Sequence, residues 1–193
     1  MRGARGTRLG LLASLYFSQG LPFGFFTLAL PVVLRARGID LHLLGASSLL
    51  LAPWSLKFLW APVIDRFGTR RQWIVPLQLL TVAVLVGLAS TDPASEVLAL
   101  SVGLFLLSVC ASTQDVATDG LAVALLPEEE RGFGNGLQVG AYRFGMIAGG
   151  AAIPAVYVSF GPSVAFLAMA GALALATIPV ALVAEAPRVR LPR

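Results

Sequence analysis

The sequence is poor in charge and in the side chains that enzymes and metal sites most often use. Of its 193 residues only 12% are charged, whereas a soluble domain carries about a quarter. It contains one cysteine, Cys110, and one histidine, His42. A single cysteine excludes an internal disulfide and a cysteine metal cluster. We therefore expect no metal, no cofactor and no enzymatic activity.

The basic residues do not form a nucleic-acid surface either. The formal net charge is +4, but the arginines cluster at the ends of apolar runs, and no basic stripe is interleaved with aromatic residues. This arrangement is typical of signals that orient a protein in a membrane. The expected partner is a lipid bilayer and not a nucleic acid.

The sequence is instead rich in long apolar runs, because 57% of its residues are hydrophobic. A tilted helix needs about 20 residues to cross a bilayer, and Gly/Pro/Asp-containing turns separate six runs of about that length. The first run is too long for a signal peptide and contains Pro22. We therefore predict an all-α integral membrane protein that forms a single six-helix bundle over residues 1–193. The predicted spans are residues 9–34, 43–64, 73–90, 97–126, 133–160 and 163–184.

Arginine asymmetry predicts the orientation, since Lys and Arg in short loops stay on the cytoplasmic side. With the N-terminus inside, the outer loops carry only Arg35 and Arg37. The arginines of the inner side would be Arg2, Arg5, Arg8, Arg66, Arg70, Arg71, Arg131, Arg188, Arg190 and Arg193. Both termini are thus expected in the cytoplasm.

Two acids lie inside the fourth predicted span. On a helix Asp115 and Asp119 fall within about 60° of Ser108 and Ser112, so one narrow polar stripe runs down an apolar cylinder. An aspartate near the bilayer centre costs about 2.5 to 3.5 kcal/mol on insertion scales. The stripe is therefore expected to face a water-filled cavity or buried partners.

Two cations, Lys57 and Arg143, lie within other spans at a similar depth, about 12 to 18 Å from the inner ends at 1.5 Å per residue. The four charges sum to zero, which favours pairing. Two hypotheses remain open. In one, an aspartate loads and releases a proton as access alternates; in the other, Asp115 and Asp119 are paired with Arg143 and Lys57 and only lock helices together. An intermediate arrangement has one acid paired and the other free.

The fifth predicted span carries a second polar face. Asn135, Gln138 and Tyr142 follow one another at spacings of three and four, and they could contact a polar solute or form interhelical hydrogen bonds. Gln19 and Gln114 are further candidates for solute contact. Small residues at four-residue spacing allow helices to approach closely. The glycines predicted to pack helices are Gly132, Gly136, Gly140, Gly145 and Gly149.

The turn after the second predicted span reads Asp65-Arg66-Phe67-Gly68-Thr69-Arg70-Arg71. It resembles the motif between the second and third helices of the major facilitator superfamily, except that Ala61 stands where that family usually has glycine. The resemblance implies a cytoplasmic gate, with Asp65 as the latch acid and Arg66, Arg70 and Arg71 as its partners. Glu128 and Arg131, in the next inner loop, are added to this gate.

Further stretches resemble the AmpG-like branch of that superfamily, which includes muropeptide permeases, siderophore permeases and acetyl-CoA transporter-like proteins. They are residues 56–62, 114–119, 126–132 and 141–146. The resemblance implies half of a major facilitator fold with a three-plus-three inverted repeat, located in the inner membrane. It also implies a proton-coupled importer of a siderophore, muropeptide or similar polar solute, which works by alternating access and is driven by the proton gradient.

Members of that superfamily have two six-helix halves, whereas this sequence accounts for one. We therefore expect the partner to be a second six-helix half, supplied by a longer chain or by a homodimer. The alternatives are a non-transporting membrane assembly or scaffold subunit, and an inactive truncated half-permease.

Overall fold

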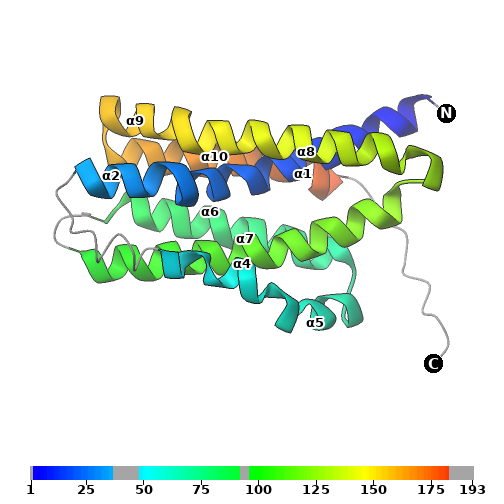
Figure 1. The fold of residues 1–193 in the computed structure, drawn as a ribbon, viewed down its shortest axis with the longest axis horizontal. Helices are drawn as coiled ribbons and strands as arrows, with labels where there is room; N and C mark the ends of the chain where they lie inside the picture. The colour runs from blue at the N-terminus through cyan, green and yellow to red at the C-terminus, as the bar shows by residue number, and fades with distance from the viewer. Residues whose placement is uncertain (1, 37–47, 92–95, 183–193) are drawn as a thin grey trace.

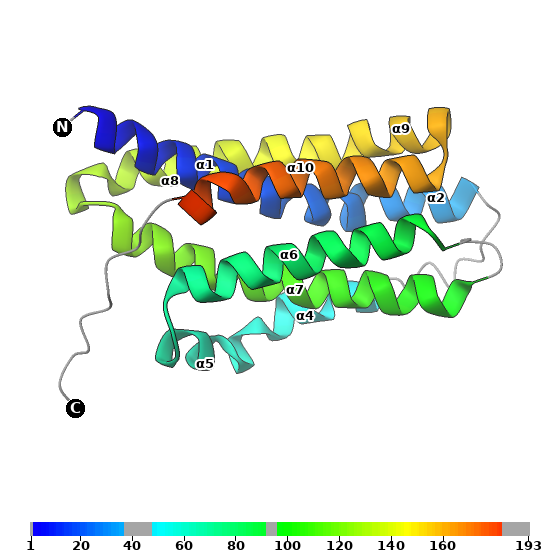
Figure 2. The same cartoon turned by 180° about the vertical axis from the view of Figure 1, so that it is seen from behind.

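The computed structural model describes residues 2–36, 48–91 and 96–182, which form an all-helical bundle (Figures 1 and 2). Within these ranges, five helices are long and apolar enough to cross a membrane. They cover Arg5–Val32, Arg70–Ala89, Leu98–Leu125, Glu128–Phe160 and Pro162–Leu182. The prediction of an all-α, multi-pass membrane protein is confirmed, while the sixth crossing is not among these helices.

Three of the spans are single helices: α6 (Arg70–Ala89), α7 (Val97–Leu125) and α10 (Pro162–Leu182). The other two are interrupted by a π-helical turn. The first runs through α1 (Arg2–Gly24), η1 (Phe25–Ala29) and α2 (Leu30–Ala36). The other, which corresponds to the fifth predicted span, runs through α8 (Arg131–Ile147), η5 (Ala148–Ala152) and α9 (Ile153–Phe160). Most of these bounds lie within three residues of the predicted ones, but the first helix begins at Arg2, seven residues before the predicted start. The predicted end at residue 184 lies outside the described residues.

Both π turns have the same cause. Pro31 and Pro154 each follow a π turn by two residues, and a proline removes one backbone donor and clashes with the carbonyl four residues earlier. That carbonyl belongs to Thr27 in one case and to Gly150 in the other, both inside the π turn. The helix widens there and then continues, so these two spans keep their length despite the prolines.

The second predicted span is not a continuous helix, which corrects the sequence prediction. Its described part consists of η2 (Ser48–Leu51), α4 (Ala52–Leu56), η3 (Lys57–Leu59) and α5 (Ala61–Arg66), whereas residues 43–47 lie outside the described part. Pro53 and Pro62 each begin a short helix, and the region around Lys57 between them is a 3-10 turn. We call residues 48–66 the broken segment. It packs on α7.

Four of the segments that were predicted to lie on one side of the membrane lie together in the structure. The N-terminal end of α1, the turn between α5 and α6, the α7–α8 connection and the end of α10 all lie at one end of the bundle (Figures 1 and 2). At this end, Gly68 adopts φ 66°. The next residue, Thr69, caps α6 in a reciprocal pair of bonds with Gln72. Glycine is required at this turn because other residues avoid a positive φ.

Helices α1 and α8 cross with their backbones almost in contact. A Cβ added at Gly145 would collide with the carbonyl oxygen of Phe17, and one at Gly149 with that of Leu21. Gly20 of α1 is equally close to the backbone of α8. Small residues permit this approach, which is a common way of joining helices in membranes.

The other three glycines that were predicted to pack do not lie at this crossing. A Cβ added at Gly132, Gly136 or Gly140 would meet no other atom within 4 Å. Counted at 100° per residue, these positions lie on the side of α8 opposite Gly145. The four-residue spacing is the same in both sets of glycines. In the described structure, however, only Gly145 and Gly149 have another helix packed against them.

Candidate functional site

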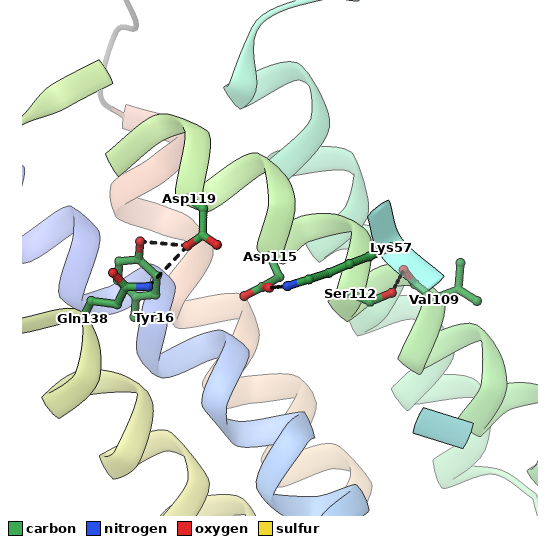
Figure 3. A network of polar contacts seen from close by, with 7 residues as sticks. All are labelled: Tyr16, Lys57, Val109, Ser112, Asp115, Asp119 and Gln138. Carbon is green, nitrogen blue, oxygen red and sulfur yellow. Dashed lines mark hydrogen bonds and ion pairs between the residues drawn. The ribbon is translucent and has the colours of Figure 1, made fainter. Parts of the chain in front are cut away.

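The polar stripe of α7 faces the middle of the bundle, where three other elements meet it. Asp115 is buried, with 8% of its surface exposed, and its carboxylate forms an ion pair with Lys57 of η3 (Figure 3). The ammonium group also lies 5.9 Å from the centre of the Trp54 ring. This acid therefore has a cation at contact distance, supplied by the broken segment.

Asp119, one turn further along α7, has different partners. The Tyr16 hydroxyl of α1 donates to its Oδ1 at 3.1 Å, and the Gln138 amide of α8 donates to the same atom at 3.4 Å (Figure 3). Both donors are neutral. Among the described residues no cation forms an ion pair with Asp119. The two acids of the stripe are thus held in two different ways.

The structure does not bring Arg143 to either acid, although the sequence offered it as a partner. Arg143 is exposed on α8. The reason is rotational: its neighbour Tyr142 contacts α1, and the next residue of a helix points about 100° away. Arg143 consequently lies on the side of α8 that also carries Gly136 and Gly140.

The serines of the stripe have structural partners. Ser108 donates to the carbonyl oxygen of Leu50 in η2 and so ties the broken segment to α7. Ser112 donates to the carbonyl oxygen of Val109 in its own helix at 3.1 Å (Figure 3). Ser112 is therefore satisfied within its own helix, and its hydroxyl bonds to no other described element.

An aromatic group borders the charged residues. Phe23 of α1 meets Trp54 of α4 edge to face, with ring centres 5.0 Å apart, and lies 5.8 Å from the ring of Tyr142. These rings join α1, the broken segment and α8 beside the Lys57–Asp115 pair. Apolar walls beside a few oriented polar groups are typical of small-molecule sites.

The candidates for solute contact fall into two groups. Gln138 and Tyr142 are half-buried and face this site, whereas Asn135 is exposed. Gln19 and Gln114 are buried in the helix interfaces. Neither polar atom of the Gln19 side chain has a hydrogen-bond partner among the described residues. Because an unsatisfied amide is costly inside an apolar bundle, Gln19 has free capacity to bind water or solute.

The predicted gate residues cluster at the end of the bundle where α1 begins. Asp65 forms an ion pair with Arg70 at 2.6 Å. The Arg70 guanidinium lies over Gly120, the residue that follows Asp119 in the sequence. Arg71 donates to the carbonyl oxygen of Ala181 at the end of α10. Arg66, Glu128 and Arg131 are exposed. The loop acid with ion-pair partners is Glu130, which binds Arg5 at 3.3 Å and Arg8 at 3.5 Å.

Sequence reasoning missed several residues that build the site. Tyr16 and Phe23 lie on the same face of α1 as Gln19, at spacings of three and four, and this pattern could have identified them. Trp54 gave no comparable signal because its helix is only one turn long. Glu130 could not be distinguished from Glu128 and Glu129, since three consecutive acids carry no information about which one turns inward.

The Lys57–Asp115 pair gives a direct stability prediction. Replacing Lys57 by methionine leaves the Asp115 carboxylate buried without its cation, and this change is expected to lower the free energy of unfolding by about 2 to 3 kcal/mol. In the double variant Lys57→Met/Asp115→Asn most of this loss should be recovered. Thermal unfolding of the purified chain in detergent, followed by circular dichroism, measures both. Equal losses in the single and double variants would contradict the pair's contribution.

Comparison with known proteins agrees with this architecture. Residues 12–193 match the model of the Major Facilitator Superfamily. The chain is 31% identical over 148 residues to the anhydromuropeptide permease of Escherichia coli K12, covering 74% of this chain and 30% of that protein. It is 33% identical over 140 residues to an uncharacterized protein of Haemophilus influenzae, covering 69% and 33% of the two chains.

A third relative is the putative transporter AmpG 4 of Rickettsia felis, 28% identical over 141 residues, covering 69% of this chain and 34% of that protein. The chain thus spans about a third of the length of the curated relatives it matches. By its helical architecture, its family match and these relatives, the chain belongs to the major facilitator superfamily, in its AmpG-like branch.

Proposed function

We propose that the chain forms the first six-helix half of a proton-coupled solute importer that works by alternating access in the inner membrane. The broken segment would supply the remaining crossing, and both termini would be cytoplasmic. A second six-helix half, from a longer chain or a second copy, would complete the solute pathway. The observation that carries the proposal is the pair of acids in α7. Asp115 is ion-paired, whereas the hydrogen bonds that Asp119 receives from the described residues come from neutral donors.

In this mechanism Asp119 is the acid that takes up the proton. Its hydrogen bonds to Tyr16 and Gln138 do not fix its charge, because a tyrosine hydroxyl can also accept a bond from a protonated carboxyl. Asp115, in contrast, is bound directly by the Lys57 ammonium of the broken segment. The two acids therefore have different roles in this mechanism: Asp119 binds the proton, and Asp115 holds the broken segment through Lys57.

The broken segment would be the moving part on this side of the pathway. It consists of short helices and is tied to α7 by the Lys57–Asp115 pair and the Ser108–Leu50 bond. Short helices tied by polar contacts open at a lower free energy than long helices packed by apolar side chains. We assign Lys57 and Tyr142 to the edge of the solute site, and Gln19, Gln138 and Asn135 as further solute contacts. Gln114 is not assigned to the solute, because its amide is buried and donates to Ser18. Arg143 would bind an anionic group of the solute or of the second half.

The proposed solute is a polar compound such as a muropeptide or a siderophore. The first class is suggested by the name of the Escherichia coli relative, and the second by the resemblance to the AmpG-like branch, which includes siderophore permeases. The test is uptake of a labelled anhydromuropeptide and of a ferric hydroxamate by vesicles from the native membrane. Accumulation of one compound that requires an imposed proton gradient is the expected result. If neither accumulates under a gradient, the proposal fails and a non-transporting assembly subunit is the better account.

A further inference from the structure

One buried hydroxyl joins three of the long helices. Ser18 of α1 donates to the carbonyl oxygen of Leu15 in its own helix at 2.7 Å. Its oxygen also accepts a bond from the Gln78 amide of α6 at 3.1 Å and one from the Gln114 amide of α7 at 3.4 Å. All three side chains are buried, and at most 4% of any of them is exposed. We call Ser18, Gln78 and Gln114 the Ser18 junction.

The junction differs from three buried threonines whose hydroxyls donate within their own helix. Thr81, Thr113 and Thr177 each donate to a carbonyl oxygen four residues earlier in the same helix. Such bonds satisfy the hydroxyl without fixing one helix against another. The Ser18 oxygen, by contrast, accepts from two other helices at once. This makes it a point at which the rotation of α1, α6 and α7 is set together.

The consequence for the charged site follows from the order of residues in α7. Gln114 directly precedes Asp115, so the two side chains point about 100° apart around the helix. The bond from Gln114 to Ser18 fixes the rotation of α7 about its axis. In this rotation the Asp115 carboxylate points toward Lys57. Lys57 cannot set this direction by itself, because it belongs to the broken segment, which packs on α7.

Gln78 supports the same interpretation. Its side-chain oxygen is buried and has no hydrogen-bond partner among the described residues, so its bond to Ser18 is the contact that holds the amide. A buried amide whose oxygen has no partner already destabilises the bundle, and losing the bond of its nitrogen as well would add to that cost. Gln78 therefore locks α6 to the same hydroxyl that orients α7.

We infer that Ser18 is a positioning residue, which holds α7 in the rotation that presents Asp115 to Lys57 through its bonds to Gln114 and Gln78. The inference rests on the role proposed above for the α7 acids, and it adds how one of them is kept in place. Loss of the Ser18 hydroxyl frees Asp115 from Lys57 for a larger fraction of the time. Asp119 is held by Tyr16 and Gln138 and is affected less.

The test compares the reactivity of the two acids in the same molecule. Dicyclohexylcarbodiimide is an apolar reagent that modifies carboxyl groups in membrane interiors, and peptide mass spectrometry separates adducts at Asp115 from those at Asp119. In membranes that contain the expressed chain, Ser18→Ala is expected to raise the Asp115:Asp119 adduct ratio about fivefold, as expected for the loss of a buried interhelical hydrogen bond. Gln78→Leu removes one of the two donors and should raise the ratio less, while Ser18→Thr should keep it near the original value.

The matched control is Ser14→Ala, the same substitution one turn earlier in α1. Ser14 also bonds across a helix interface, to the carbonyl oxygen of Ala176 in α10 at 3.0 Å, but it has no bond to α7. Its adduct ratio should stay unchanged. An unchanged ratio in Ser18→Ala, a parallel rise at both acids, or an equal rise in Ser14→Ala would each overturn the inference. The assay needs neither solute nor gradient, so its result is independent of whether the proposed transport occurs.

Discussion

Replacing Asp119 by asparagine is expected to abolish proton-driven accumulation of the solute while leaving solute exchange across the membrane. Asparagine resembles the protonated, neutral carboxyl group but cannot release a proton. Steps in which the carrier stays loaded remain possible, whereas the return of the empty carrier, which requires deprotonation, is blocked. The expected loss of net uptake is about 150-fold, at the upper end of the range that a coupling free energy between two sites usually gives.

The measurement is the initial rate of labelled solute uptake into native-membrane vesicles under an imposed gradient, with exchange against preloaded solute measured in parallel. Ser112→Ala is the matched control, because Ser112 lies on the same stripe of α7 but bonds only within its own helix. It should transport at the original rate. If Asp119→Asn accumulates solute at the original rate, Asp119 is not the coupling acid.

The second large effect concerns the crossing of α1 and α8. Gly145→Val is expected to prevent the bundle from forming, because even the first carbon of the new side chain would overlap the carbonyl oxygen of Phe17. Backbone atoms cannot move aside as the end of a flexible side chain can. We expect a loss of at least about 3 kcal/mol, at the upper end of what overpacking costs, and little folded protein.

Gly140→Val is the matched control for this prediction. The same side chain is added to the same helix, but at a position where no atom lies within 4 Å. The yield of monodisperse protein in mild detergent and its thermal midpoint should be unchanged for this chain. Equal effects of the two substitutions would show that helix propensity, and not the close crossing, determines the result.

The sequence was sufficient to predict the long helices, because long apolar runs and the arginines at their ends are strong signals. It also identified the acids of α7, since two carboxylates in an apolar span are unusual. The broken segment was missed because its apolar residues resemble those of a continuous span, and because a proline alone does not decide the matter: Pro76 and Pro179 lie inside continuous helices. Only the placement of Pro53, Lys57 and Pro62 in the fold shows that the helix is divided there.

Partner choice was the other point that the sequence left open. Lys57 and Arg143 are equivalent by depth and charge, and only the rotation of α8 shows that Arg143 points away from both acids. In the same way, two series of glycines with equal spacing were both expected to pack, and the structure places them on opposite sides of one helix. The Ser18 junction was missed because a lone serine and a lone glutamine in two apolar helices carry no pattern.

The central claim is that this chain is part of a carrier that moves solute together with protons. The most direct test is the pH inside native-membrane vesicles, followed with an enclosed pH-sensitive dye when solute is added outside without any imposed gradient. The account predicts acidification of the interior on addition of solute, and no acidification in Asp119→Asn vesicles. Solute entry without any change of internal pH would contradict it.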